Sequence, residues 1–321
     1  MLINPALAAF LESTESDKAC GVKPVMHRLT PARARQEYDD AARALDAPGP
    51  AVESIVAISI PGRDGQLIDA RLYTPASLCG IVGLLPVLLY FHGGGYCVGG
   101  FDSHDSICRS LAVLTPCCVL HVAYRLAPEH RFPAAVNDVQ DAYLWVLSRG
   151  AAFALDAARL AVGGDCAGGT LAAGLAITAR NRGWPPPVGQ VLLYPCTGAR
   201  QNTDSYRRFA RGYWLEIETL QWMYANYLSS EQERFDWRFA LLQTKDLSNL
   251  PPALIVLAEY DPLIDEGISY AARLQAAGVT TLLNIYPGMV HDFARLGGIV
   301  DEAQRVRKDI ARALADVFYS H

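Results

Sequence analysis

The sequence lacks any dense run of basic residues and is only mildly acidic. Lys and Arg number 28 and Asp and Glu number 33, which gives a formal net charge of -5 at pH 7. Proteins that neutralise nucleic-acid phosphates concentrate Lys and Arg in a stripe or patch. We therefore expect no nucleic-acid partner.

A hydrophobic run long enough to span a bilayer is also missing. The most apolar stretch, residues 81–91, contains Pro86 and runs into His92, whereas a spanning helix needs about 20 apolar residues. The N-terminus has no basic region and reaches Glu12 early, unlike a secretory signal peptide. We expect no membrane span and, by default, a cytoplasmic location.

Metal-finger and redox patterns are absent as well. The 8 cysteines include no CxxC pair and show no finger spacing with the 7 histidines, so we expect no metal site. In a reducing compartment most cysteines behave as small buried hydrophobes. The adjacent Cys117 and Cys118 fit that description, and Cys166 is the exception.

What the sequence does contain is an alternation of short apolar runs with helix-length segments. This pattern predicts an α/β fold with a mostly parallel central sheet flanked by helices. The runs are nearly continuously apolar, as in strands covered on both faces. They are residues 85–91, 119–124, 160–163, 190–194, 253–258 and 282–286, preceded by β-branched runs at 55–60 and 67–73 and followed by an amphipathic helix at 302–318.

Two segments fall outside this alternation. Near the N-terminus, Asn4 and Thr30 each precede a proline, which predicts capped helices over residues 6–11 and 32–45. Residues 197–250 form a long aromatic-rich departure, which in a compact domain is usually functional or an inserted subdomain. Together with the N-terminal helices, this segment could cover the C-terminal edge of the sheet. An apolar cover there favours a substrate with an apolar portion. The predicted domains are a core of residues 51–196 and 251–321 and a helical cap of residues 1–50 and 197–250.

Residues 164–168, Gly-Asp-Cys-Ala-Gly, fit the frame of a nucleophile elbow with Cys166 where serine is usual. They directly follow a predicted strand and precede an Ala-rich helix. Glycines are needed there because a sharp turn brings backbones into contact. The helix N-terminus behind Cys166 favours a thiolate.

Residues 92–95, His-Gly-Gly-Gly, follow another predicted strand. Such a loop can turn backbone N–H groups toward a reacting carbonyl and, with the N–H of Ala167, form an oxyanion hole. A phosphate cradle is the alternative, but the Lys-Ser/Thr and the G-x-G-x-x-G spacing that it needs are both missing.

An orienting acid and a basic histidine are expected later in the chain, in that order. Asp261 and His291 each come just after a predicted strand, at the sheet edge where the elbow also points. Asp265 is the backup acid. Asp292 and Glu259 are interpreted as solvated or capping groups.

Together these motifs resemble the bacterial hormone-sensitive-lipase branch of the α/β-hydrolases. The resemblance extends over about residues 50–320 and includes the cap. It rests on residues 92–96 (His-Gly-Gly-Gly-Tyr), 103–105 (Ser-His-Asp), 124–130 (Tyr-Arg-Leu-Ala-Pro-Glu-His), 164–169 (Gly-Asp-Cys-Ala-Gly-Gly), 261–263 (Asp-Pro-Leu) and 291–293 (His-Asp-Phe).

The resemblance implies an α/β-hydrolase fold and a cofactor-free carboxylesterase that forms an acyl-enzyme from short to medium acyl esters. By analogy, the terminal strand and helix can support a homodimer. Carried over by position, the roles fall to Cys166 as nucleophile, His291 as base, Asp261 as orienting acid, and Gly93, Gly94 and Ala167 as oxyanion donors.

Cys166 is where this chain departs from that family, which has serine there. A thiol ionises more readily than a hydroxyl, but the larger sulfur misaligns an oxyanion hole built for oxygen. Three interpretations stay open: a native cysteine-dependent acyl hydrolase, acyltransferase or thioesterase; a Ser-to-Cys variant of an ordinary serine carboxylesterase; and a non-catalytic ligand-binding homologue.

Overall fold

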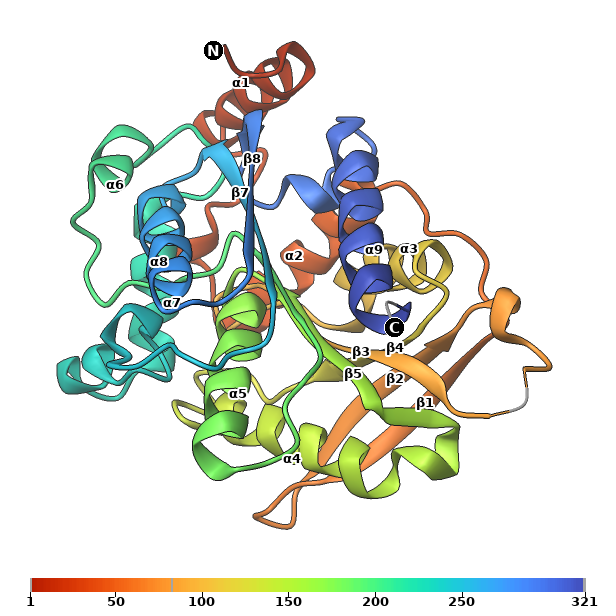
Figure 1. Cartoon of the computed structure of the whole chain (residues 1–321). Coiled ribbons are helices and arrows are strands. Elements are labelled where there is room, and N and C mark those ends of the chain that lie inside the picture. The colour runs from red at the N-terminus through yellow and green to blue at the C-terminus, as the bar shows by residue number, and fades with distance from the viewer. Residues whose placement is uncertain (1, 82, 320–321) are drawn as a thin grey trace.

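The computed structural model describes residues 2–81 and 83–319 of the chain. Its centre is an eight-stranded sheet (Figure 1). The strands are β1 (Ser54–Pro61), β2 (Leu67–Thr74), β3 (Leu85–Phe91), β4 (Cys118–Ala123), β5 (Leu155–Asp165), β6 (Gln190–Leu193), β7 (Ala253–Tyr260) and β8 (Thr281–Val290). They lie in the order β1-β2-β4-β3-β5-β6-β7-β8. The pairs β1–β2 and β2–β4 are antiparallel and all others are parallel, which confirms the predicted mostly parallel sheet.

Helices cover both faces of the sheet. The α-helices are α1 (Pro5–Ala19), α2 (Pro31–Leu45), α3 (Phe101–Leu114), α4 (Ala134–Arg149), α5 (Ala167–Arg182), α6 (Asp204–Arg208), α7 (Ile217–Tyr227), α8 (Ile264–Ala276) and α9 (Glu302–Tyr319). Short 3-10 turns are η1 (Met26–Arg28), η2 (Ala76–Leu78), η3 (Gly150–Phe153), η4 (Glu231–Phe235), η5 (Leu241–Gln243) and η6 (Phe293–Arg295). Helices α3 and α9 pack together on one face, and α4 and α5 on the other (Figure 1).

The core is built from the apolar strands and from a helix that is buried almost all round. Every residue of β3 is buried, as the continuous apolar run predicts. Helix α5 is buried from Ala167 to Ala179. Its Ala and Gly residues let the helix axis approach the sheet closely, which larger side chains would prevent.

Strands β7 and β8 are longer than the sequence predicts, and this positions the functional residues. The prediction ends the last strand before Pro287 and Gly288, but β8 continues to Val290 after a register shift against β7. Tyr260 then pairs with Val290. Asp261 and His291 therefore leave neighbouring strand ends side by side.

Both N-terminal helices are present, and α1 is longer than predicted. The Asn4 side chain accepts a hydrogen bond from the N–H of Ala6 at 3.0 Å, and Thr30 caps α2 by accepting from Arg33 at 3.4 Å. Helix α1 runs on to Ala19. The assignment of residues 1–50 and 197–250 to a helical cap separate from the core stays a prediction.

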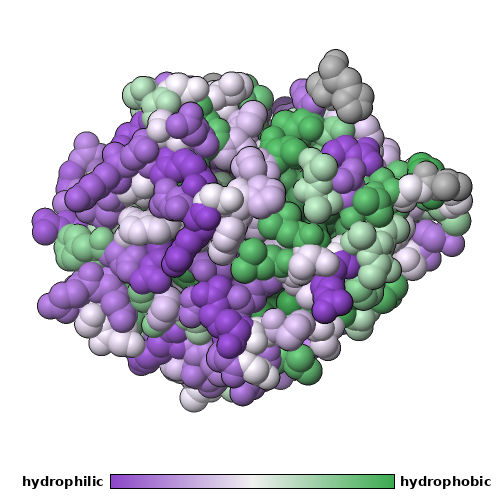
Figure 2. All heavy atoms as spheres, turned by 60° about the horizontal axis from the view of Figure 1, so that its bottom comes forward, coloured by the Kyte–Doolittle hydropathy of each residue, from purple (hydrophilic) through white to green (hydrophobic). Residues whose placement is uncertain are grey.

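Hydrophobic side chains are unevenly distributed over the surface. Figure 2 shows a face on which hydrophilic side chains fill one side and hydrophobic ones gather on the other. Exposed apolar side chains include Ile55 and Val56 on the edge strand β1 and Leu67 on β2. Among the residues described, no helix combines the length and apolarity needed to cross a bilayer.

Candidate active site

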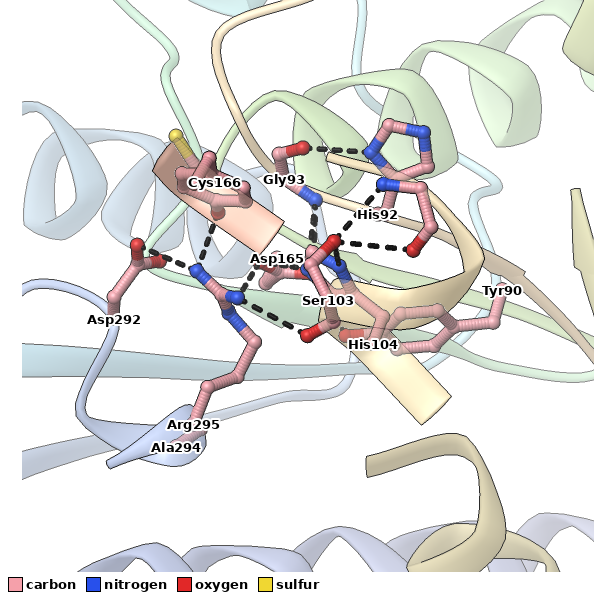
Figure 3. A network of polar contacts seen from close by, with 12 residues as sticks. Tyr90, His92, Gly93, Ser103, His104, Asp165, Cys166, Asp292, Ala294 and Arg295 are labelled. Atoms are coloured by element: carbon pink, nitrogen blue, oxygen red, sulfur yellow. Dashed lines mark hydrogen bonds and ion pairs between the residues drawn. The ribbon is translucent and has the colours of Figure 1, made fainter. Parts of the chain in front are cut away.

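Cys166 sits at the turn between β5 and α5, in a conformation that side chains rarely adopt. Its φ and ψ angles are 51° and -120°, so the backbone is strained. The N–H of Cys166 donates to the carbonyl of Leu193 at 2.8 Å. The residue is 4% exposed, and its sulfur points away from the polar network beneath the turn (Figure 3).

Two glycines make this turn sterically feasible. A Cβ atom on Gly164 would lie 2.3 Å from the carbonyl oxygen of Phe91, and one on Gly168 would lie 2.0 Å from the same atom. No side chain fits at those distances. The glycine requirement inferred from the sequence therefore has a direct steric cause.

Gly168→Ala is expected to destabilise the fold by about 3 kcal/mol, because backbone atoms on both sides must move. The matched control is Gly174→Ala in the same helix, where a Cβ meets nothing closer than 3.9 Å. We expect that control to be neutral or slightly stabilising. Urea unfolding of both variants measures the difference, and equal midpoints would contradict the steric account.

His291 is held in place by Asp261. Nδ1 of the imidazole lies 2.7 Å from Oδ2 of the carboxylate, and both side chains are almost fully buried. The other carboxylate oxygen accepts the N–H of Leu263 at 2.8 Å. This arrangement fixes the proton on Nδ1 and leaves Nε2 facing the site. Nε2 has no hydrogen-bond partner among the described residues.

The Cys166 thiol and the His291 imidazole lie close enough to shift each other's pKa. Burial alone would lower the pKa of His291, but the charges of Asp261 and Cys166 raise it well above its ordinary value. A hydrogen bond from Cys196 lowers the pKa of Cys166 to about 6, and His291 acts in the same direction. Both shifts favour a thiolate on Cys166 beside an imidazolium on His291.

Cys196 is the functional neighbour that sequence reasoning missed. Its sulfur lies 3.8 Å from that of Cys166, and only Cys196 can donate once Cys166 is ionised. The same hydrogen bond, together with burial, raises the pKa of Cys196 well above its ordinary value. Cys196 follows β6 just as Asp261 follows β7, so the sheet-edge rule could have found it.

The rate at which iodoacetamide alkylates Cys166 is expected to rise with pH through a midpoint near 6, not near the ordinary value of 9.0. Only the thiolate reacts, so a lowered pKa moves the curve to lower pH. In Cys196→Ala the midpoint should move up toward 9 because the donor is lost. Peptide mass spectrometry measures the labelling. An unchanged midpoint would rule out the proposed hydrogen bond.

The structure of the glycine loop contradicts the prediction that Gly93 is an oxyanion donor. The N–H of Gly93 already donates to Oδ1 of Asp165 at 3.1 Å, and Gly93 does not line the cavity that Cys166 faces, whereas Gly94 and Gly95 do. Their N–H groups have no protein acceptor among the described residues. Ala167 is the first residue of α5, so its N–H has no acceptor within the helix.

A buried polar network fixes this loop under the elbow (Figure 3). Asp165 accepts hydrogen bonds from Tyr90 at 2.7 Å and from Gly93, and it lies 3.1 Å from Nε2 of His104. Burial alone would raise the pKa of Asp165, but contacts with His104 and Arg295 hold it below its ordinary value. The charged carboxylate therefore clamps the glycine loop to the turn.

The side chain of Asp292 is neither solvated nor a helix cap, contrary to the sequence interpretation. The residue is 8% exposed and lines the cavity. Oδ2 accepts a hydrogen bond from Arg295 at 2.9 Å, while Oδ1 lies 3.8 Å from Nε2 of His291. The hydrogen bond from the Arg295 guanidinium holds the Asp292 side chain inside the protein.

The other two acids considered in the sequence lie elsewhere. Asp265 accepts a hydrogen bond from the N–H of Ser205, and Glu259 accepts one from the N–H of Gly288.

A cavity of about 350 Å³ opens above the sulfur. Its walls come from segments far apart in the sequence, and they are mainly apolar. Phe10 and Trp214 lie with ring centroids 5.3 Å apart, and Lys18 pairs with Glu216 at 3.2 Å. The lining includes Phe10, Tyr38, Leu45, Trp214, Met223 and the reactive pair Cys166 and His291.

Comparison with known proteins gives consistent matches. A family profile described as alpha/beta hydrolase fold matches residues 88–295. The chain is 40% identical over 319 residues to an ethyl acetate hydrolase of Pseudomonas putida, covering 98% of this chain and 99% of the relative. A solved ester-hydrolase from the metagenome of Lake Arreo superposes with a TM-score of 0.94 at 35% identity, covering 99% of both chains. An esterase of Pyrobaculum calidifontis gives a TM-score of 0.88 at 34% identity over 98% of both chains.

Proposed function

Because the chain belongs to the alpha/beta hydrolase fold family, we propose that it hydrolyses carboxylic esters through an acyl-enzyme formed on Cys166. The family membership confirms the predicted fold class. The relatives are named as ester hydrolases, which supports carboxylic ester hydrolase activity. The observation that carries the finer proposal is a thiol facing the cavity together with an imidazole that Asp261 holds at 2.7 Å.

In the first half of the proposed reaction, the Cys166 thiolate attacks the ester carbonyl carbon. The negative charge that develops on the carbonyl oxygen is stabilised by N–H groups of Gly94, Gly95 and Ala167. This assignment replaces Gly93, whose N–H is engaged by Asp165. The His291 imidazolium then gives its proton to the leaving alcohol, and a thioester remains on Cys166.

In the second half, His291 takes a proton from water, and the hydroxide attacks the thioester carbonyl carbon. The C–S bond then breaks, the acid leaves, and Cys166 returns to a thiolate beside the protonated His291. Asp261 keeps the imidazole oriented throughout and stabilises its charged form. Asp292 adds negative charge near Nε2. No step requires a cofactor.

The cavity is proposed to bind the acyl or alcohol portion of short to medium esters. Its apolar walls and its volume of about 350 Å³ suit such groups. We expect p-nitrophenyl acetate and butyrate to be hydrolysed much faster than the palmitate ester. Steady-state kinetics over the chain-length series test this. Saturable binding of butyrate esters without any release of p-nitrophenol would instead favour a non-catalytic binding homologue.

Acyl transfer is the second candidate, because a thioester inside an apolar cavity is a good donor to alcohols, amines and thiols. Adding butanol during p-nitrophenyl butyrate turnover should then yield butyl butyrate, which gas chromatography detects. Release of butyric acid alone, at an unchanged rate, would leave hydrolysis as the only activity.

The homodimer and the cytoplasmic location expected from the sequence stay predictions. β8 is an edge strand, and it exposes Leu282 and Ile285. A second copy would pair there. Light scattering of the purified chain measures the oligomeric state.

A further inference from the structure

The thiol of Cys196 lies beside the proposed nucleophile, Cys166. In the proposed ester hydrolysis it forms no covalent bond. The sulfur atoms of Cys166 and Cys196 lie 3.8 Å apart, and the two residues are only 4% and 2% exposed. A disulfide bond is about 2 Å long, so the sulfurs need to approach by roughly another 2 Å to bond. The two sulfurs are thus in contact but not yet at bonding distance.

The loop that carries Cys196 is held firmly at this position. The hydroxyl of Thr170 donates to the carbonyl of Cys196 at 2.6 Å. The next two N–H groups, of Thr197 and Gly198, donate to Glu266 at 2.6 and 3.1 Å. These contacts hold the backbone of residues 196–198, so this segment cannot move Cys196 away from Cys166 without breaking them.

The other thiols are placed differently. Among the cysteines described, Cys166 is the one that lines the cavity. Cys97 points its sulfur at the carbonyl of Met223, at 3.4 Å. Cys20 and Cys79 are exposed on the surface. A small oxidant entering the cavity therefore meets Cys166 first, with Cys196 directly behind it.

We propose that Cys196 is a resolving thiol, and that hydrogen peroxide entering the cavity converts Cys166 and Cys196 to a disulfide that reversibly blocks the site. In the first step the Cys166 sulfur attacks one peroxide oxygen, the S–O bond forms, the O–O bond breaks, and water leaves after protonation by His291. In the second step the Cys196 sulfur attacks the sulfenic acid, the S–S bond forms, the S–O bond breaks, and a second water leaves with the Cys196 proton. The two sulfurs lose two electrons, which the peroxide gains.

This proposal shares with the proposed function only the reactivity of Cys166. Its chemical advantage is protection, because a sulfenic acid that meets no thiol is oxidised further to sulfinic acid, which thiols do not reverse. The presence of Cys196 at 3.8 Å diverts the sulfenic acid into the disulfide. A dithiol reductant then regenerates the site.

The experiment uses the full chain in a Cys20→Ser/Cys79→Ser background, which removes the exposed thiols. Hydrogen peroxide is added, free thiols are blocked with iodoacetamide, and peptide mass spectrometry maps the products. We expect loss of two hydrogens in a peptide pair joining Cys166 to Cys196, with full recovery on dithiothreitol treatment.

The matched control is Cys196→Ser in the same background, with Cys196→Val as a second variant if the serine disturbs the loop. Both should gain two oxygens at Cys166 and should not recover with dithiothreitol. Equal sulfinic acid formation at Cys166 with and without Cys196 would overturn the proposal. A disulfide in a chain that hydrolyses no ester would instead sink the proposed function and leave this inference standing.

Discussion

Cys166→Ala is expected to lower kcat/KM for p-nitrophenyl butyrate by about 10⁴-fold or more, because the atom that forms the acyl-enzyme is gone. Oxyanion donors and the binding cavity remain, so a small residual rate above that in water should persist. Steady-state kinetics measure the loss. The control is Cys118→Ala, which truncates a buried thiol in β4 and should keep most of the activity.

The substitution Cys166→Ser distinguishes an enzyme whose native nucleophile is cysteine from one whose active site is adapted to serine. The account predicts a lower kcat/KM, because a hydroxyl is not ionised at neutral pH and gains nothing from the Cys196 donor at 3.8 Å. A large rise in kcat/KM would favour the other interpretation, in which the chain is a Ser-to-Cys variant of a serine carboxylesterase. Retention of activity in Cys166→Ala would exclude both.

Arg295→Leu is expected to cost about 3 to 5 kcal/mol of folding stability, because it leaves buried carboxylates without their cation. The guanidinium donates to Asp292 at 2.9 Å and to the carbonyl of Ser103 at 3.2 Å, and lies 3.9 Å from Asp165. It also bonds the hydroxyl of Tyr38. Urea unfolding measures the loss, and activity should fall with it because Asp165 holds the glycine loop.

Arg312→Leu is the control for that experiment. The Arg312 side chain is 76% exposed and pairs with Asp309 on α9, where solvent screens the interaction. Its urea midpoint should match that of the parent. If Arg295→Leu also matches the parent, the network of Figure 3 contributes nothing to stability.

The strands and the residues at their ends follow largely from the sequence. Continuous apolar runs predict buried parallel strands, and the carboxyl ends of such strands meet at one edge. That rule places Asp261 and His291 at the same edge, and the structure brings their side chains within 2.7 Å of each other. The ends of the strands are harder to predict than their existence. Pro287 and Gly288 indicate that the last strand ends before them, yet Tyr260 pairs with Val290 and the strand continues.

Side-chain environments were less accessible to sequence reasoning. In the sequence Asp292 is indistinguishable from an ordinary loop acid, because the burial of Arg295 beside it is visible only in the structure. Gly93 and Gly95 are equivalent in a run of glycines, and the contact of Gly93 with Asp165 and the position of Gly95 in the cavity wall distinguish them. The sequence predicts that Cys196 is a small buried hydrophobe, because the distance between two sulfurs depends on backbone geometry that sequence spacing does not encode.

Intact-protein mass spectrometry after rapid mixing with p-nitrophenyl butyrate and an acid quench tests the central claim most directly. The account predicts one butyryl group per chain, mapped to Cys166 and released by neutral hydroxylamine, as expected of a thioester. A butyryl group on any other side chain during turnover would contradict it.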